Sequence, residues 1–437
     1  LENILYVHFN CFNYWFKIRF SLMNLQLKKS QISNLKSEIV ITGSKSETNR
    51  LLLLQALYPN LVLENISNSD DSEVMLKVLK NFQLPISDFH FDIHHAGTAM
   101  RFLTSFFAIQ EGKEVVLTGS SRMKERPIQI LVAALNQLGA EISYVEKEGF
   151  PPIKIKGKKI LKNQVSLPAN VSSQYISALL LIAPKLENGL ELTLEGEITS
   201  VPYIKMTLAL LNEIGVKTSF EKNVIKVNRL QTITSKLITV ESDWSSASYW
   251  YSIVALSEIG TQITLTSYKK NSLQGDSILV EVYEDIGVNT IFNEDNSITI
   301  IKVESYKGVY LFRDLRDSPD IAQTLAVTCF GLGYEFELHG LHTLKIKETD
   351  RLVALHAELT KLGAEVSIDE DSIVVLFSKK INKNVSIATY QDHRMAMAFA
   401  PLALKTSIII QNAEVVSKSY PAFWEDLEKV GFQSESI

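Results

Sequence analysis

The stretch 135-LNQLGAEISY-144 recurs through the chain in four further variants. Each copy reads as the end of an amphipathic helix, then a glycine, then a short strand. The glycine suits the left-handed residue that follows many helices, because a residue without a Cβ adopts positive φ at little cost. The four variants are 211-LNEIGVKTSF-220, 283-YEDIGVNTIF-292, 359-LTKLGAEVSI-368 and 427-LEKVGFQSES-436.

The spacing of these glycines sets the size of a repeated unit. They lie at positions 139, 215, 287, 363 and 431, so successive copies are 76, 72, 76 and 68 residues apart. A similar step back from Gly139 reaches 76-LKVLKNFQL-84, where we expect Asn81 to serve in the same turn. Self-similarity of this length indicates a repeated supersecondary unit. We therefore predict an α/β chain of six such units from about residue 44 onward.

Six strongly apolar stretches recur with the same period. Each begins at polar residues of the type that cap helices, and each is hydrophobic on nearly all sides. We expect them to form buried core helices, the last of them kinked at Pro401. The stretches are 44–57, 97–109, 172–183, 243–256, 320–330 and 392–404.

Basic residues gather near the starts of these helices, and the motifs RMKERP and KIKETDR add further bases. Helix N-termini and basic side chains are the usual devices that hold phosphate and carboxylate groups. In a chain of net charge −5, the pattern predicts a site for small anions. The bases in or near first turns are Lys45, Arg50, Arg101 and Arg394.

The motif 345-KIKETDRL-352 shows this pattern most clearly. Leucines at 352, 355, 359 and 362 indicate an amphipathic helix, with Lys347 and Arg351 in its first turn. Positive charge is unfavourable there, because the helix N-terminus is itself partially positive. We interpret these two bases as complements of a ligand. Glu348, taken alone, reads as a first-turn carboxylate that answers the helix dipole.

Composition excludes several other classes of protein. The 437 residues, 46% of them hydrophobic, can bury a large core and suggest two or three domains. The negative net charge argues against general nucleic-acid binding. Cys11 and Cys329 are too few for a disulfide framework, which favours a cytoplasmic location. No apolar run is long enough to span a membrane, and no HExxH, cysteine pair or EF-hand pattern predicts a metal.

Residues 1–22, LENILYVHFNCFNYWFKIRFSL, lie outside the repeats. They are rich in aromatic residues and have no clean small-residue cleavage site, so a signal peptide is not indicated. Met23 begins a more ordinary sequence. We interpret 1–22 as an N-terminal extension that is non-native or disordered.

Nine short motifs occur in an order that is typical of one enzyme family. They are GSKSETNR, AGTAMRFLTS, TGSSRMKERPI, VSSQYISALL, SVPYI, DWSSASYW, NSLQGD, KIKETDRL and DHRMAMAF. From Met23 to its C-terminus the chain resembles the EPSP synthases (3-phosphoshikimate 1-carboxyvinyltransferases), the enolpyruvyl transferases of the shikimate pathway. GSKS alone is a weak signal, but KETDR, RMKERP and DHRMAM together are highly specific.

The resemblance implies a fold and a reaction. The family's fold has two globular domains of three βαβαββ units each, here 44–240 and the combination of 23–43 with 241–437. The substrates bind in the cleft between them. The reaction transfers the enolpyruvyl group of phosphoenolpyruvate to the 5-hydroxyl of shikimate 3-phosphate. We expect a monomer without a cofactor that binds these two anions and neither nucleic acid nor a membrane.

The resemblance also implies the site residues. Asp320, Glu348 and Lys45 would be catalytic, Glu348 as proton donor and Asp320 as proton acceptor. Shikimate 3-phosphate would be bound by Lys45, Ser46, Arg50, Ser172, Ser173, Ser200, Asp320 and Lys347. Phosphoenolpyruvate would be bound by Lys45, Gly97, Arg126, Gln174, Arg351, Arg394 and Lys418.

The proposed donor raises a question of charge. Glu348 must carry a proton when it acts, yet its neighbours Lys347 and Arg351 favour the ionised form. Burial or proton exchange with Asp320 would have to offset them.

Three positions depart from the family's pattern. His95 stands where Asn commonly precedes AGTAMR, and Phe102 stands where Pro often follows the arginine. Thr343 stands where Asn usually lies four residues before the lysine of KETDR, at an expected shikimate contact. For that reason Thr343 is not among the expected site residues.

Two other interpretations stay open. UDP-N-acetylglucosamine enolpyruvyl transferases commonly carry a reactive cysteine on the loop that corresponds to 119-GSSRMKERP-127, which has none here. A non-catalytic protein that binds anions or RNA ends on related repeats would not need Glu348 and Asp320 beside the bases. Phosphate release that requires both substrates would separate the three.

Overall fold

The computed structural model describes residues 23–30, 36–168, 172–196, 198, 201–304, 310–376 and 380–437. The expected extension 1–22 and the expected ligand Ser200 lie outside the described residues. Along the described chain, helices alternate with short strands that pair into several small sheets.

All five repeat glycines have positive φ, which confirms the predicted helix–turn–strand unit. Each stands between the end of a helix and the start of a strand. The φ values of Gly139, Gly215, Gly287, Gly363 and Gly431 are 107°, 98°, 84°, 101° and 98°.

Asn81 does not belong to this set, and that prediction is wrong. It is the last residue of α2 (Asp70–Asn81), and Phe82 continues with right-handed backbone at φ −65°. The ring of Phe82 packs against Phe89 and Phe107 at 4.8 and 4.9 Å. The right-handed backbone therefore serves to carry an aromatic ring into the core rather than to reverse the chain.

Five sheets of four strands share one pairing pattern in the described part of the chain. A parallel pair is followed by two antiparallel pairings, the arrangement that a βαβαββ unit produces, because parallel neighbours need a crossover helix. In sheet order, three of them are β4 (Asp88–Asp92), β5 (Glu114–Thr118), β7 (Ile153–Lys156), β6 (Glu141–Tyr144); β8 (Gln164–Pro168), β9 (Leu190–Glu195), β11 (Val224–Val227), β10 (Thr218–Glu221); and β16 (Tyr310–Asp314), β17 (Glu335–His339), β19 (Ile373–Leu376), β18 (Glu365–Ile368).

The other two four-stranded sheets take a strand from the N-terminal segment. They are β2 (Lys36–Ile39), β13 (Gln262–Leu265), β15 (Ile298–Lys302), β14 (Val288–Phe292); and β20 (Val385–Ile387), β21 (Ile408–Ile410), β1 (Leu25–Lys28), β22 (Gln433–Ser436). The sixth sheet has two described strands, β3 (Leu61–Glu64) and β12 (Lys236–Thr239), which pair in parallel. Strands from the two ends of the chain thus complete units that begin elsewhere.

Six helices form the predicted buried set, and most of the side chains on them are buried. Their bounds are α1 (Lys45–Leu57), α3 (Gly97–Ala108), α6 (Ser173–Ile182), α8 (Trp244–Leu256), α10 (Ala322–Leu332) and α12 (His393–Phe399). The remaining helices are the outer α2, α5 (Gln129–Leu138), α7 (Val201–Glu213), α9 (Leu279–Glu284), α11 (Arg351–Lys361) and α13 (Phe423–Lys429), the short α4 (Ser121–Lys124), and the 3₁₀ segments η1 (Ala183–Lys185), η2 (Gly275–Ile278), η3 (Pro319–Ile321), η4 (His342–Ile346), η5 (Ala400–Leu404) and η6 (Ala413–Lys418).

The expected kink at Pro401 is instead a change of helix type. The α-helix α12 ends at Phe399. The 3₁₀ segment η5 begins at Ala400 and has Pro401 as its second residue. Proline has no N–H to donate to the carbonyl four residues earlier, so the α-helical hydrogen bonding stops there.

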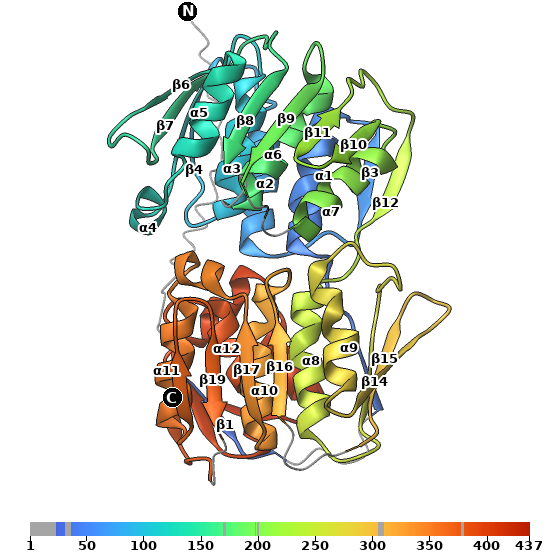
Figure 1. The fold of residues 1–437 in the computed structure, drawn as a ribbon, viewed down its shortest axis with the longest axis vertical. Helices are drawn as coiled ribbons and strands as arrows, with labels where there is room; N and C mark the ends of the chain where they lie inside the picture. The colour runs from blue at the N-terminus through green and yellow to red at the C-terminus, as the bar shows by residue number, and fades with distance from the viewer. Residues whose placement is uncertain are drawn as a thin grey trace, which may run out of the picture.

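The buried side chains form two separate hydrophobic cores. One is built from residues between Leu51 and Val240. The other combines Leu25 to Ile41 with residues from Trp244 onward. Figure 1 shows the two corresponding halves one above the other, with α1, α3 and α6 in the upper half and α8, α10 and α12 in the lower.

The chain crosses between the halves twice, and the two crossings lie side by side. Gly43 and Ser242 form an antiparallel bridge, and Ser44 N–H donates to the Glu241 carbonyl at 2.8 Å. A Cβ at Gly43 would come within 1.9 Å of the Asn65 carbonyl oxygen. Only glycine allows this close approach at the crossing.

Candidate active site

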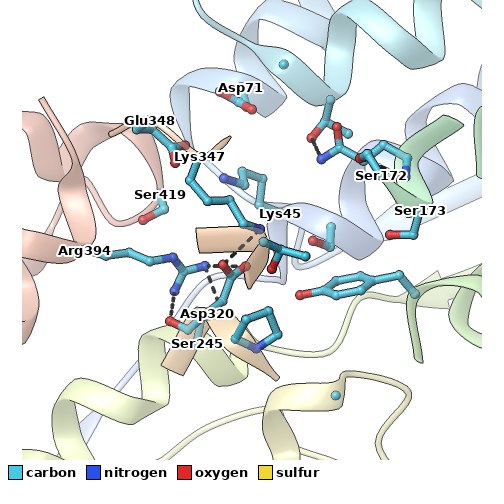
Figure 2. Close-up of a pocket in the computed structure, with 18 of the residues that line it drawn as sticks. Lys45, Asp71, Ser172, Ser173, Ser245, Asp320, Lys347, Glu348, Arg394 and Ser419 are labelled. Carbon is cyan, nitrogen blue, oxygen red and sulfur yellow. Dashed lines mark hydrogen bonds and ion pairs between the residues drawn. The ribbon is translucent and has the colours of Figure 1, made fainter. Parts of the chain in front are cut away.

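A cavity of about 530 Å³ lies between the two halves. Every expected site residue that the structure describes lines it, so the fold brings these residues together in one place. The lining comes from both halves, including Lys45, Ser172 and Ser173 on one side and Asp320, Lys347, Glu348 and Arg394 on the other (Figure 2).

Helix starts converge on this cavity. Lys45, Gly97 and Ser173 are the first residues of α1, α3 and α6, and Arg394 is the second residue of α12. The unpaired N–H groups of a helix start carry partial positive charge. Together with the basic side chains they make a strongly anion-attracting cavity in a protein of net negative charge.

Arg351 is the centre of an ion-pair cluster, and it is 1% exposed. Its guanidinium contacts Asp392 at 2.6 Å, Asp320 at 2.9 Å and Glu348 at 2.9 Å. Burial opposes the charge, but Asp392, Glu348 and Asp320 together raise the pKa of Arg351 above its ordinary value. The guanidinium is therefore held by three carboxylates of the protein itself.

Asp320 is surrounded by three bases. Its carboxylate contacts Arg351 at 2.9 Å, Arg394 at 3.1 Å and Lys347 at 3.4 Å. Burial would raise the pKa of Asp320, but Arg394, Lys347 and Arg351 lower it well below its ordinary value. The group is ionised at neutral pH, as a proton acceptor must be.

Glu348 is likewise ionised. Its carboxylate contacts Lys418 at 2.8 Å and Arg351 at 2.9 Å. Burial would raise the pKa of Glu348, yet Lys418 and then Arg351 lower it well below its ordinary value. In this arrangement the bases outweigh burial, so a proton must reach Glu348 before it can serve as a donor.

The interpretation of Glu348 as a first-turn carboxylate is wrong. The helix α11 begins at Arg351, and Asp350 is its N-cap, accepting from the N–H groups of Leu352 and Val353 at 3.1 and 3.2 Å. Lys347 therefore also lies outside the first turn. Asp350 already accepts from free N–H groups at the start of the helix, so Glu348 is not needed as a cap. The Glu348 carboxylate instead contacts Lys418 and Arg351.

The side-chain ammonium group of Lys45 has no hydrogen bond or ion pair with any residue that the structure describes. It influences the ionisation of Glu348 and of His393, both in the other half. An uncommitted ammonium group at a helix start is available to a ligand from either side of the cavity.

Gly97 lies under two guanidinium groups. A Cβ at this position would come within 2.6 Å of Arg126 Nη1 and 2.7 Å of Arg101 Nη1. Arg101 donates to the Gly97 carbonyl at 2.7 Å and lies 5.6 Å from the Tyr175 ring. Burial, with the charge of Arg101, lowers the pKa of Arg126 to about 10. A nearby anion would relieve this unfavourable proximity of like charges.

Arg50 reaches the cavity but is already engaged by neutral oxygens. Its N–H groups donate to Thr207 Oγ1 at 2.8 Å, Ser46 O at 2.7 Å and Ser177 Oγ at 3.0 Å. A fourth bond runs to the Tyr203 carbonyl at 3.3 Å. Of its five N–H groups, these contacts leave one for a ligand carboxylate.

The start of α6 presents the expected phosphate-binding serines. Ser172 is the N-cap and accepts from Gln174 N–H at 3.4 Å, with Ser173 beside it. The Gln174 amide donates to Thr98 Oγ1 at 3.2 Å, and Tyr175 Oη donates to the Pro127 carbonyl at 2.6 Å. The loop that carries Arg126 is thereby tied to α6.

The cavity-lining residues that are missing from the sequence prediction include Asp71, Ser245, Asp276 and His393. Asp71, Ser245 and His393 lie in the first turns of helices. The same position identified the basic site residues in the sequence, so these three could have been found in the same way. Neither ring nitrogen of His393 has a hydrogen-bond partner in the described structure. Burial, then Lys45 and Arg394, lower the pKa of His393 well below its ordinary value, which leaves the imidazole neutral.

The departures from the family's pattern fall differently. Thr343 lines the cavity, and its buried Oγ1 has no partner within the described chain. His95 is not among the lining residues. Phe102 is buried, and the Arg50 guanidinium lies over its ring, 5.5 Å from the ring centroid.

The described residues contain no group of His, Cys, Asp and Glu that could hold a metal ion. None of their helices combines the length and apolar character needed to cross a membrane.

Comparison with solved structures identifies the same fold elsewhere. An EPSP synthase from Acinetobacter baumannii superposes with a TM-score of 0.77 at 21% identity, covering 95% of this chain and all of that one. The enolpyruvyl transferase NikO from Streptomyces tendae gives a TM-score of 0.69 at 12% identity, covering 95% and 98%. At these identities the likeness concerns the fold, and it confirms the predicted α/β class.

Comparison of sequences identifies the family. A 3-phosphoshikimate 1-carboxyvinyltransferase of Bacteroides fragilis is 46% identical over 404 residues, which is 92% of this chain and 96% of the relative. The enzyme of that name from Histophilus somni is 36% identical and covers 93% and 99%. The family model for EPSP synthase (3-phosphoshikimate 1-carboxyvinyltransferase) matches residues 29–427. The chain belongs to the EPSP synthase family.

Proposed function

We propose that this enzyme transfers the enolpyruvyl group of phosphoenolpyruvate to the 5-hydroxyl of shikimate 3-phosphate, which yields 5-enolpyruvylshikimate 3-phosphate and inorganic phosphate. The observation that carries the proposal is one cavity that combines bases from both halves with two ionised carboxylates, Asp320 and Glu348. Two substrates that each carry a carboxylate and a phosphate require this density of positive charge.

The reaction needs two proton transfers. The methylene carbon of phosphoenolpyruvate gains a proton, and the 5-hydroxyl loses its proton as its oxygen attacks the adjacent carbon. The resulting tetrahedral intermediate then expels phosphate and returns the carbon-bound proton. We assign the hydroxyl proton to Asp320, whose ionised carboxylate is a suitable acceptor, and the carbon-bound proton to Glu348.

Glu348 is ionised in this structure, and its ion pairs explain how it could gain a proton when substrate binds. Lys418 and Arg351 hold its pKa down, and both are expected ligands of phosphoenolpyruvate. As the substrate's anionic groups draw these bases, they stabilise the Glu348 carboxylate less. Its buried position then raises its pKa, and the group becomes able to carry a proton.

The remaining site assignments follow the same logic. Lys45, Gly97, Arg126, Gln174 and Arg394 would complete the phosphoenolpyruvate site. Ser46, Arg50, Ser172, Ser173, Ser200 and Lys347 would hold shikimate 3-phosphate. We further propose that the domains follow the two cores, with 44–240 as one and 23–43 plus 241–437 as the other, and that the enzyme acts as a cytoplasmic monomer.

The test is an assay of phosphate release with each substrate alone and with both. The proposal predicts release only when phosphoenolpyruvate and shikimate 3-phosphate are present together. Release with UDP-N-acetylglucosamine in place of shikimate 3-phosphate would support the related transferase instead. That outcome is disfavoured because the described cysteine, Cys329, is buried in a core and does not line the cavity. Binding of either anion without turnover would indicate a non-catalytic protein.

A further inference from the structure

Arg394, an expected ligand of phosphoenolpyruvate, is held by oxygens of two residues. Its guanidinium contacts Asp320 twice, at the carboxylate and at the backbone carbonyl, each at 3.1 Å. The third contact is Ser245 Oγ, which accepts from Nη2 at 3.3 Å (Figure 2). Ser245 thus contacts Nη2, the nitrogen that also meets the Asp320 carboxylate.

Whether Ser245 can accept depends on where its own proton points. A hydroxyl has one proton, and the lone pairs are free to accept only in directions away from it. The backbone of Ser245 is fixed, since its N–H donates to the N-cap Asp243 at 2.8 Å. Its hydroxyl proton is donated to Asp276 Oδ2. Asp276 therefore decides how the Ser245 oxygen meets Arg394.

Asp276 is built into the site at an energetic cost. It is 4% exposed, it lines the cavity, and its second oxygen, Oδ1, has no hydrogen-bond partner in the described structure. Burial, and then the charge of Asp320, raise the pKa of Asp276 to about 7. A buried carboxyl with an unsatisfied oxygen destabilises a fold, so stability does not account for this residue.

The segment that carries Asp276 contacts both halves of the molecule. Ser272 Oγ donates to Glu241 at 2.7 Å, and the Gln274 amide donates to the Ser242 carbonyl at 2.9 Å, which ties the segment to the second crossing. Leu273 packs against the core of the upper half. A Cβ at Gly275 would lie 3.2 Å from Pro202 at the start of α7. The position of Asp276 is thus set relative to both halves.

We propose that Asp276 is a positioning residue for phosphoenolpyruvate binding: it orients the Ser245 hydroxyl so that the Ser245 oxygen aligns the Arg394 guanidinium. This inference rests on the proposed function, because it takes Arg394 to be a ligand of phosphoenolpyruvate. Asp276 acts through Ser245 and touches no substrate itself.

The experiment is a double-mutant cycle on steady-state kinetics. Asp276→Ala removes the oxygen that accepts from the Ser245 hydroxyl. The KM for phosphoenolpyruvate should then rise about three- to tenfold, which is less than the full loss of one charge-assisted hydrogen bond would cause. The KM for shikimate 3-phosphate should stay within about twofold of wild type. Asp276→Asn keeps an oxygen that accepts from Ser245, and it should restore most of the affinity. In a Ser245→Ala background, Asp276→Ala should add nothing, because the mediator is gone.

A matched control separates positioning from a general loss of structure. Asp426 is also 4% exposed and accepts from the Tyr420 hydroxyl at 2.8 Å, but it does not line the cavity. Asp426→Ala should lower Tm without the selective rise in KM. Equal effects of Asp276→Ala on both KM values, additivity with Ser245→Ala, or no effect in an active enzyme would each overturn the inference. An inactive wild-type protein would instead overturn the proposed function.

Discussion

At the scale of single residues, the chemistry of Glu348 depends on its neighbours. The same carboxylate would be a modest helix-stabilising charge in a first turn, but the chain places it ahead of Asp350, between Lys418 and Arg351. These two bases lie within hydrogen-bonding distance and keep the Glu348 carboxylate ionised. Glu348 also lines the cavity in which we expect both substrates to bind.

Glu348→Gln tests this assignment, because glutamine keeps the size of the side chain but cannot cycle a proton. Turnover should fall at least about a hundredfold, the usual contribution of a general acid–base group. The KM for shikimate 3-phosphate should change little. Solvent deuterium should enter the methylene group of phosphoenolpyruvate more slowly, in proportion to turnover. Wild-type turnover with unaltered deuterium exchange would move the proton donor elsewhere, first to Lys45.

At the scale of elements, the repeats deliver helix starts to the cavity, and five of the six close with a left-handed glycine. At Gly215 the conformation is isolated from packing, since φ is 98° and a built Cβ would meet no atom within 4 Å. Any cost of a side chain there must come from the backbone itself.

Gly215→Ala should therefore lower the free energy of unfolding by about 1–2 kcal/mol, measured by urea denaturation. Gly215→Asn should cost less, because asparagine tolerates left-handed geometry better than alanine. Activity per folded molecule should be unchanged in both. Equal stability of the alanine variant and wild type would show that the turn relaxes without strain.

At the scale of the whole molecule, the two halves contribute bases of different kinds. Arg126 is partly exposed beside Gly97, whereas Arg351 is buried among three carboxylates. Both are expected to bind phosphoenolpyruvate, yet only Arg351 also holds its own half together.

The two alanine variants should accordingly differ. Arg126→Ala should raise the KM for phosphoenolpyruvate and leave Tm nearly unchanged. Arg351→Ala leaves buried carboxylates without their partner and should cost about 3–5 kcal/mol of stability. Thermal melts beside kinetics measure both effects. A large loss of Tm for Arg126→Ala, or none for Arg351→Ala, would contradict this division.

Glu47, a buried acid near the crossing between the halves, should make the stability of the protein depend on pH. Glu47 is 2% exposed, its Oε2 has no partner in the described chain, and Glu241, Glu213 and Lys269 face it. Burial raises the pKa of Glu47 from 4.5 to about 7, with Lys269 opposing the shift. An acid whose pKa rises on folding stabilises least once it is ionised, so stability is lost as pH increases from about 4.5 through about 7.

Glu47→Gln removes this titration. The difference in unfolding free energy between variant and wild type should favour the variant by about 1–3 kcal/mol more at pH 8 than at pH 5. Chemical denaturation at both pH values measures it, with the exposed Glu73→Gln as the matched control. A difference that does not change with pH would rule out ionisation of Glu47 as its source.

The repeated unit and the anion-attracting character of the site can be read from the amino-acid sequence. Local patterns carry this information: a glycine after a helix needs positive φ whatever surrounds it, and a base in the first turn of an apolar helix is unusual in any fold. The positions of the core helices and of the repeat glycines could be read in advance for this reason. The prediction for Asn81 is wrong because the packing of Phe82 against Phe89 and Phe107 outweighs the local turn signal.

Which groups meet, and what charge they carry, depends on the folded arrangement of the chain. The β1 and β2 strands join sheets whose other strands follow hundreds of residues later, and no local pattern encodes that pairing. The ionisation of Glu348 depends on Lys418, 70 positions away, and the role inferred for Asp276 depends on Ser245 and Arg394. Burial and ion pairing act through distance in space, and the chain sets that distance only when it is folded.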